Sequence, residues 1–143
     1  MRAISMLRSV LILIPLLIGS ATSALCATPR ELAGTNWRWI ALASSTETLT
    51  VLEPDRYTLA FTNGDRVALR ADCNRGAGSV AFPAAGVVQF GPLALTRALC
   101  PSGSLGERFA REVGRAARWS VRGDELALEL ESGEAVLRFK RHP

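Results

Sequence analysis

Residues that can ligate a metal or act as a nucleophile are few in this sequence. It contains three cysteines, Cys26, Cys73 and Cys100, and one histidine, His142, at the penultimate position. Metal sites and Cys-His pairs use several such groups at short spacings, such as CxxC or HExxH, and the sequence has neither. It also lacks a Gly-x-Ser-x-Gly nucleophile elbow. We therefore expect no metal site, no cofactor and no catalytic residues, in a protein that is not an enzyme.

The first 27 residues have the layout of a secretory signal peptide. Arg2 and Arg8 lie before the apolar run 10–18, small residues follow it, and no residue of the segment is acidic. The nine-residue run contains Pro15, whereas a membrane-spanning helix needs roughly 20 apolar residues. We expect export to the periplasm or envelope of a bacterium, one domain over residues 28–143, and cleavage after Ser23, Cys26 or Ala27.

Cys26 permits a second interpretation, because bacterial lipoproteins begin with an acylated cysteine just after an apolar run. Such sites resemble Leu-Ala-Gly-Cys, with a small residue directly before the cysteine. Here Leu25 occupies that position, which disfavours lipidation. Acylation of Cys26 stays open as the one route by which we expect the protein to contact a membrane.

The other two cysteines predict a disulfide. If Cys26 leaves with the signal peptide or carries lipid, Cys73 and Cys100 form an even pair in an oxidising compartment, where disulfides persist. Closing a loop of about 27 residues stabilises a fold by roughly 3 kcal/mol in the chain-entropy model. We therefore expect Cys73 to be linked to Cys100.

Charge argues against nucleic acid as a partner. The net charge of +4 at pH 7 falls to about +2 once Arg2 and Arg8 are removed, since 15 basic residues then face 13 acidic ones. Four arginines still share one side of a predicted helix, where they either bind anionic lipid, lipopolysaccharide phosphate or an acidic protein, or form a solvated face. These are Arg108, Arg111, Arg115 and Arg118. The near-neutral total favours the solvated face.

Short apolar segments alternate with Gly, Pro, Asn and Asp, and one helical stretch lies near the end. This pattern predicts a mainly β (α+β) domain, a small antiparallel β-barrel of about eight strands with one packed helix. Trp37 and Trp39 share one strand face, where they line a ligand cavity or fill the core, and the scarcity of other aromatic residues favours the core. The expected strands are 36–42, 57–62, 66–71, 79–82, 87–90 (with an extension to Leu95 as an alternative), 118–122, 125–131 and 134–140.

Two hairpin registers follow from keeping apolar partners on one face. A loop at Ser132-Gly133 places Leu128 opposite Leu137 and Glu125 opposite Lys140. At Asn63-Gly64 a two-residue loop mixes the faces, so we expect a three-residue or bulged turn that places Phe61 opposite Val67.

Two further segments give local predictions. Ser104 and Glu107 form a capping-box pattern for a helix that runs to about Ala117, with an apolar stripe packed on the sheet. Residues 72–78 lack the Gly-Lys-Ser/Thr ending of a phosphate loop. There we expect a tight turn beside the disulfide, with Asn74 bonded to the turn's backbone.

The order of several short motifs resembles the META domain, also called the heat-shock HslJ-like family. These motifs are LAGTNW (32–37), CNRG (73–76), FGPLALTRALCP (90–101) and GDELAL (123–128). The resemblance implies a lipocalin-like barrel with a helix laid against it, in exported proteins associated with heat stress, envelope robustness or virulence, and no established reaction. It marks Asn74, Arg75, Thr96 and Arg97 as motif residues. The sequence departs from the pattern at Asp72, where a glycine is usual, and at Gly76, where an aromatic residue is common.

Together these observations predict an exported, non-catalytic cell-envelope protein that is stress- or envelope-related and binds a protein or a surface component. The alternative is a barrel that binds a small apolar ligand near Trp37 and Trp39. The sequence identifies neither the partner nor the oligomeric state.

Overall fold

The computed structural model describes residues 27–143. The predicted signal peptide, its cleavage sites up to Cys26 and the lipidation of Cys26 therefore fall outside the described residues. Ten strands, one 3-10 helix and one α-helix follow in the order β1 (Asn36–Ser44), β2 (Thr48–Thr50), η1 (Pro54–Arg56), β3 (Tyr57–Phe61), β4 (Arg66–Ala71), β5 (Asn74–Ala81), β6 (Gln89–Phe90), β7 (Ala94–Leu95), α1 (Gly106–Gly114), β8 (Ala116–Arg122), β9 (Glu125–Leu130) and β10 (Ala135–His142).

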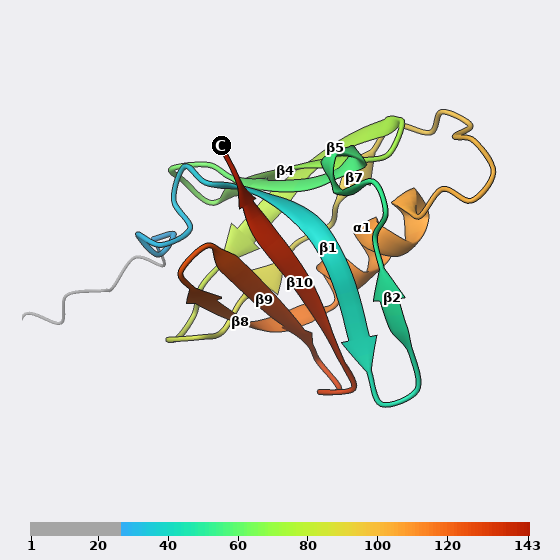
Figure 1. Ribbon diagram of the computed structural model, residues 1–143. Helices are drawn as coiled ribbons and strands as arrows, with labels where there is room; N and C mark the ends of the chain where they lie inside the picture. The colour runs from blue at the N-terminus through green and yellow to red at the C-terminus, as the bar shows by residue number, and fades with distance from the viewer. Residues whose placement is uncertain (1–26) are drawn as a thin grey trace, which may run out of the picture.

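Eight strands form a nearly closed antiparallel barrel, in the order β6-β5-β4-β3-β1-β10-β9-β8, while β2 pairs with β1 and β7 with β5 (Figure 1). The two ends of this order meet at a bridge between Val87 and Arg118. The amide of Val88 donates to the carbonyl of Ala117 at 3.0 Å, and that of Trp119 donates to Gly86 at 3.0 Å. The predicted fold class, a barrel of about eight strands with one packed helix, is confirmed.

Both predicted hairpin registers are confirmed. Leu128 pairs with Leu137 and Glu125 with Lys140, across the turn at Ser132-Gly133. Phe61 pairs with Val67, and Thr62 donates to Arg66 at 3.0 Å, which leaves residues 63–65 as the expected three-residue loop. Apolar alternation fixes both registers, because a shift by one residue would turn each buried face to solvent.

Helix α1 packs over the barrel core through Phe109 and Val113, which have no exposed surface. The Phe109 ring stacks on Trp39, with centroids 5.3 Å apart. The predicted capping box is half right. The Ser104 hydroxyl accepts from the Gly106 amide at 3.2 Å, as expected, and also bonds to the carboxylate of Asp72. The helix begins at Gly106 with Leu105 at the N-cap position, and the Ser104 amide donates to the Pro101 carbonyl rather than to Glu107. The helix also ends at Gly114, because β8 already begins at Ala116.

The glycine-rich segment after Cys73 corrects a second prediction. Residues 74–78 are not a tight turn but the first half of β5, paired with β4. A Cβ atom on Gly76 would lie 2.7 Å from Cγ of Leu95, and one on Gly78 would lie 2.8 Å from the carbonyl oxygen of Pro92. The glycines are therefore needed because residues 92–95 lie directly against this strand.

The segment after Val88 forms two short strands on the same edge of β5. Val80 pairs with Phe90, and Ala77 pairs with Ala94. Between these two pairs there are three positions along β5 but four along the partner segment. This extra residue is a β-bulge between two stretches that both pair with β5. Within residues 27–143, no helix combines the length and apolar character that crossing a membrane requires.

Candidate functional site

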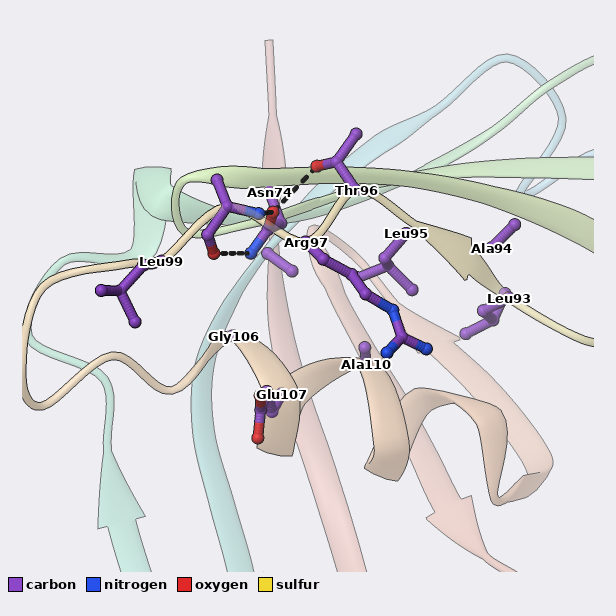
Figure 2. A pocket seen from close by; sticks show the side chains of 12 residues that line it. Asn74, Leu93, Ala94, Leu95, Thr96, Arg97, Leu99, Gly106, Glu107 and Ala110 are labelled. Atoms are coloured by element: carbon purple, nitrogen blue, oxygen red, sulfur yellow. Dashed lines mark hydrogen bonds between the residues drawn. The ribbon is translucent and has the colours of Figure 1, made fainter.

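A surface hollow of about 760 Å³ lies at the outer edge of β7, beside the start of α1. One wall is the continuous stretch from Leu93 to Leu99, which comprises β7 and the loop after it, and the other is the first turns of α1 with Glu107 and Ala110. Figure 1 shows the long connection between β7 and α1 projecting beyond the barrel. Figure 2 shows the hollow between this connection and the helix.

Asn74 holds the upper wall of the hollow in place. Its side-chain oxygen accepts from the Thr96 hydroxyl at 2.9 Å and from the Ala98 amide at 2.7 Å, and its amide group donates to the Ala98 carbonyl at 3.1 Å (Figure 2). The Thr96 hydroxyl accepts in turn from the Arg75 amide at 3.0 Å. The prediction that Asn74 bonds to its own turn is wrong, because these partners lie 22 and 24 positions further along the chain.

The predicted disulfide between Cys73 and Cys100 is present, with the two Cα atoms 5.5 Å apart. It joins the residue before β5 to the far end of the loop that Asn74 holds. The Asn74 amide also donates to the Cys100 sulfur at 3.3 Å. The loop is thus attached to β5 by a covalent bond and by a group of hydrogen bonds, which together restrict its conformations.

The two motif arginines have different surroundings. Arg75 donates to the backbone carbonyls of Asp72 and Asn74, each at 3.4 Å. Arg97 lines the hollow, and Figure 2 shows its guanidinium extending from the loop toward the helix turn that carries Ala110. Among residues 27–143 no carboxylate forms a salt bridge with Arg97, so its charge faces the hollow without a paired anion.

Asp72 is an unusual residue at the turn between β4 and β5. It is 2% exposed and has φ +64°, a conformation that glycine adopts without strain. Its carboxylate accepts from Nε of Arg56 at 2.7 Å and from the Ser104 hydroxyl. The Ser104 hydrogen bond, followed by Arg56, lowers the pKa of Asp72 although burial opposes the shift. The departure from the family pattern is therefore offset by partners that stabilise the charged carboxylate.

Both tryptophans lie in the core with no exposed surface. Nε1 of Trp37 donates to the Thr35 hydroxyl at 2.7 Å, and Nε1 of Trp39 donates to the Ala41 carbonyl at 2.8 Å. Neither lines the hollow. Their position gives no support to a ligand-lining role.

Each arginine of the predicted row has an acidic neighbour. Arg108 bonds to Glu47 at 2.9 Å, Arg115 and Arg111 contact Glu112 at 3.1 and 3.4 Å, and Arg118 lies 3.9 Å from Glu129. Arg118 belongs to β8 rather than to the helix. These pairs reduce the positive potential of the row, and partner binding by the four arginines stays a prediction.

Leu99 is the site residue that the sequence analysis missed, together with the helix residues opposite it. Its side chain is fully exposed, at 101% of the reference value, on the rim of the hollow. A leucine directly before a cysteine is the signal that marks it in the sequence. The described residues hold no cluster of three or more His, Cys, Asp or Glu side chains able to bind a metal ion.

These features define a small disulfide-linked antiparallel barrel with one helix and a tethered loop. The META domain family model matches residues 30–143, and the chain belongs to this family. No curated protein sequence matches the chain.

Solved structures with low sequence identity share the fold. An NMR structure of a protein from Burkholderia xenovorans is 23% identical, with a TM-score of 0.66, and the match covers 78% of this chain and 84% of that one. A crystal structure of a DUF4847 family protein from Bacteroides vulgatus is 12% identical, with a TM-score of 0.56, covering 76% and 93%.

Proposed function

We propose that this protein is an exported, non-catalytic binding protein of the bacterial cell envelope, and that it contributes to envelope robustness under stress. The observation that carries the proposal is the tethered loop, which presents Arg97 and Leu99 at a hollow. A fully exposed leucine is unfavourable in water and becomes favourable when a partner covers it. Export is supported by the signal-peptide layout of residues 1–27 and by the Cys73–Cys100 disulfide, which persists in oxidising compartments.

The export part is tested by producing the full chain in a bacterial host and fractionating the cells. We expect the mature protein in the periplasmic or envelope fraction, without residues 1–23 at least, and with Cys73 linked to Cys100 by mass spectrometry. Full-length protein in the cytoplasm with three alkylatable thiols, Cys26 included, would refute export.

The binding part is tested by photo-crosslinking in intact cells of the producing bacterium. A photoreactive amino acid replaces Leu99 in one variant and Leu52 in a matched control, since Leu52 is also exposed, at 90%, but lies away from the hollow. We expect a discrete crosslinked product from position 99 and none from position 52. Equal crosslinking at both positions, or none at position 99, would contradict binding at this site.

A further inference from the structure

The wall of the hollow formed by β7 has a free backbone edge. The Thr96 amide donates to the Arg75 carbonyl at 2.8 Å, so Thr96 and Arg75 face each other as a hydrogen-bonded pair. Hydrogen-bonded and non-hydrogen-bonded pairs alternate along an antiparallel ladder. The next pair, Leu95 with Gly76, is therefore a non-hydrogen-bonded pair, in which the N–H and C=O groups point away from the partner strand. The amide and carbonyl of Leu95 therefore point away from β5, and β7 pairs with no other strand of residues 27–143.

This edge lies opposite a helix and not opposite another strand. Glu107 and Ala110 of α1 form the facing wall, and the space between is about 760 Å³, within the range of about 300–1,000 Å³ that is usual for binding sites. An open strand edge beside a helix is the arrangement in which an extended peptide adds as a further strand while its side chains contact the helix. The hollow thus has both the unpaired backbone groups and the second wall that this mode of binding uses.

The charge of the hollow indicates which peptide fits. Arg97 points toward the helix turn that carries Ala110 and forms no salt bridge within the described residues, and Glu107 lines the same hollow from the helix (Figure 2). A carboxylate of the added strand placed at Arg97 would form a charge-assisted hydrogen bond. Apolar side chains on the same peptide would meet Leu93, Leu95 and Ala110.

We propose that the groove between residues 93–99 and α1 binds an extended, acidic peptide segment of another protein by strand addition to β7. This inference rests on the proposed binding function and specifies its site and the chemistry of its partner. The disulfide and Asn74 serve it by holding the edge rigid, which lowers the entropy that is lost when a peptide adds.

The test measures fluorescence anisotropy with a panel of labelled octapeptides of alternating valine and threonine, each with one aspartate at a different position. We expect at least one peptide to bind the oxidised protein, and its asparagine analogue to bind about fivefold more weakly. In Arg97→Gln the two analogues should bind equally, whereas the control Arg122→Gln, an exposed arginine of β8 outside the groove, should keep the difference. Arg97 makes no side-chain hydrogen bond within residues 27–143, so its replacement leaves the fold intact, which a proton NMR spectrum checks.

Strand addition is separated from other binding by N-methylation of the peptide. Methyl groups on one alternate set of amides should weaken binding about tenfold or more, because those amides pair with β7, and methyl groups on the other set should have little effect. Equal effects of the two sets, or no binding by any peptide up to about 1 mM, would overturn the proposal. If the peptides fail while the crosslink at position 99 is found, the groove proposal fails and the binding function stands; if both fail, both are wrong.

Discussion

At the scale of single residues, Asp72 shows how a charge replaces a glycine at a turn with positive φ. The residue has little contact with water, and its carboxylate is held by Ser104 and Arg56. A buried carboxylate is stable only when such partners offset the loss of hydration. The turn therefore depends on two residues that are distant in sequence.

The lowered pKa of Asp72 predicts how stability depends on pH. Because the folded pKa lies below the unfolded value of about 3.9, the carboxylate stabilises the fold above that pH and loses this contribution as the pH falls through the folded pKa. Asp72→Asn should be less stable than the wild type at pH 7, and the difference should shrink below about pH 4. Urea unfolding at pH 7, 5 and 3 measures this, and a constant difference would contradict the assigned role.

Gly76 predicts a steric effect. Alanine at this position would bring its Cβ to 2.7 Å from Cγ of Leu95, so Gly76→Ala should destabilise the fold by about 1–3 kcal/mol. Gly64→Ala is the matched control, since the nearest atom would lie 4.0 Å away, and it should be neutral within about 0.5 kcal/mol. Equal unfolding free energies for the two variants would show that residues 92–95 do not pack on β5.

At the scale of elements, the loop between β7 and α1 is positioned by its attachment to β5. Removing the disulfide with Cys73→Ser and Cys100→Ser together should cost about 3 kcal/mol, because the unfolded chain regains the freedom of the closed loop. Denaturant unfolding of the oxidised and the double-variant proteins compares the two. A cost near zero would mean that hydrogen bonds from Asn74 alone fix the loop.

Helix α1 is attached mainly through its aromatic residue. Phe109→Ala removes a ring that packs on Trp39, Tyr57 and Phe139, and it should destabilise the protein by about 3–5 kcal/mol. Glu107→Ala, an exposed change on the same helix, should have little effect and serves as the control. Similar unfolding midpoints for the two variants would show that the helix is not part of the core.

The sequence predicted some elements well because their determinants are local. Alternation of apolar residues gave both hairpin registers, and the even cysteine pair gave the disulfide. The capping box was only half right: Ser104 accepts from the Gly106 amide as expected, but its own amide donates to Pro101 rather than to Glu107, and its hydroxyl also bonds to Asp72, which lies far away in sequence. Residues 74–78 were predicted to be a turn because of their glycines. In the strand these glycines are needed because Leu93 and Leu95 pack directly against it, and local sequence patterns do not report such packing. The hollow was missed because its walls, residues 93–99 and the start of α1, are brought together by tertiary packing, which local patterns do not report.

At the scale of the whole molecule, the segment that contains β6 and β7 completes the barrel wall only at its first end. There it is bonded to β8, whereas at its second end the outer edge of β7 is unpaired within residues 27–143. Val87 and Val88 join β8, whereas residues 93–99 diverge from it and face α1. The molecule therefore combines a filled core with one unpaired strand edge at its surface. Open edges usually attract other strands, and here the neighbouring helix limits what can reach the edge.

Amide hydrogen exchange measured by NMR tests this arrangement most directly. In the free, oxidised protein we expect slow exchange at Thr96 and Ala98, whose amides donate to the Arg75 carbonyl and the Asn74 side chain, and fast exchange at Leu95 and Arg97. Saturation with the bound aspartate octapeptide should slow exchange at Leu95. Protection of Leu95 before any peptide is added, or unchanged exchange at Leu95 after saturation, would contradict an open edge that receives a partner strand.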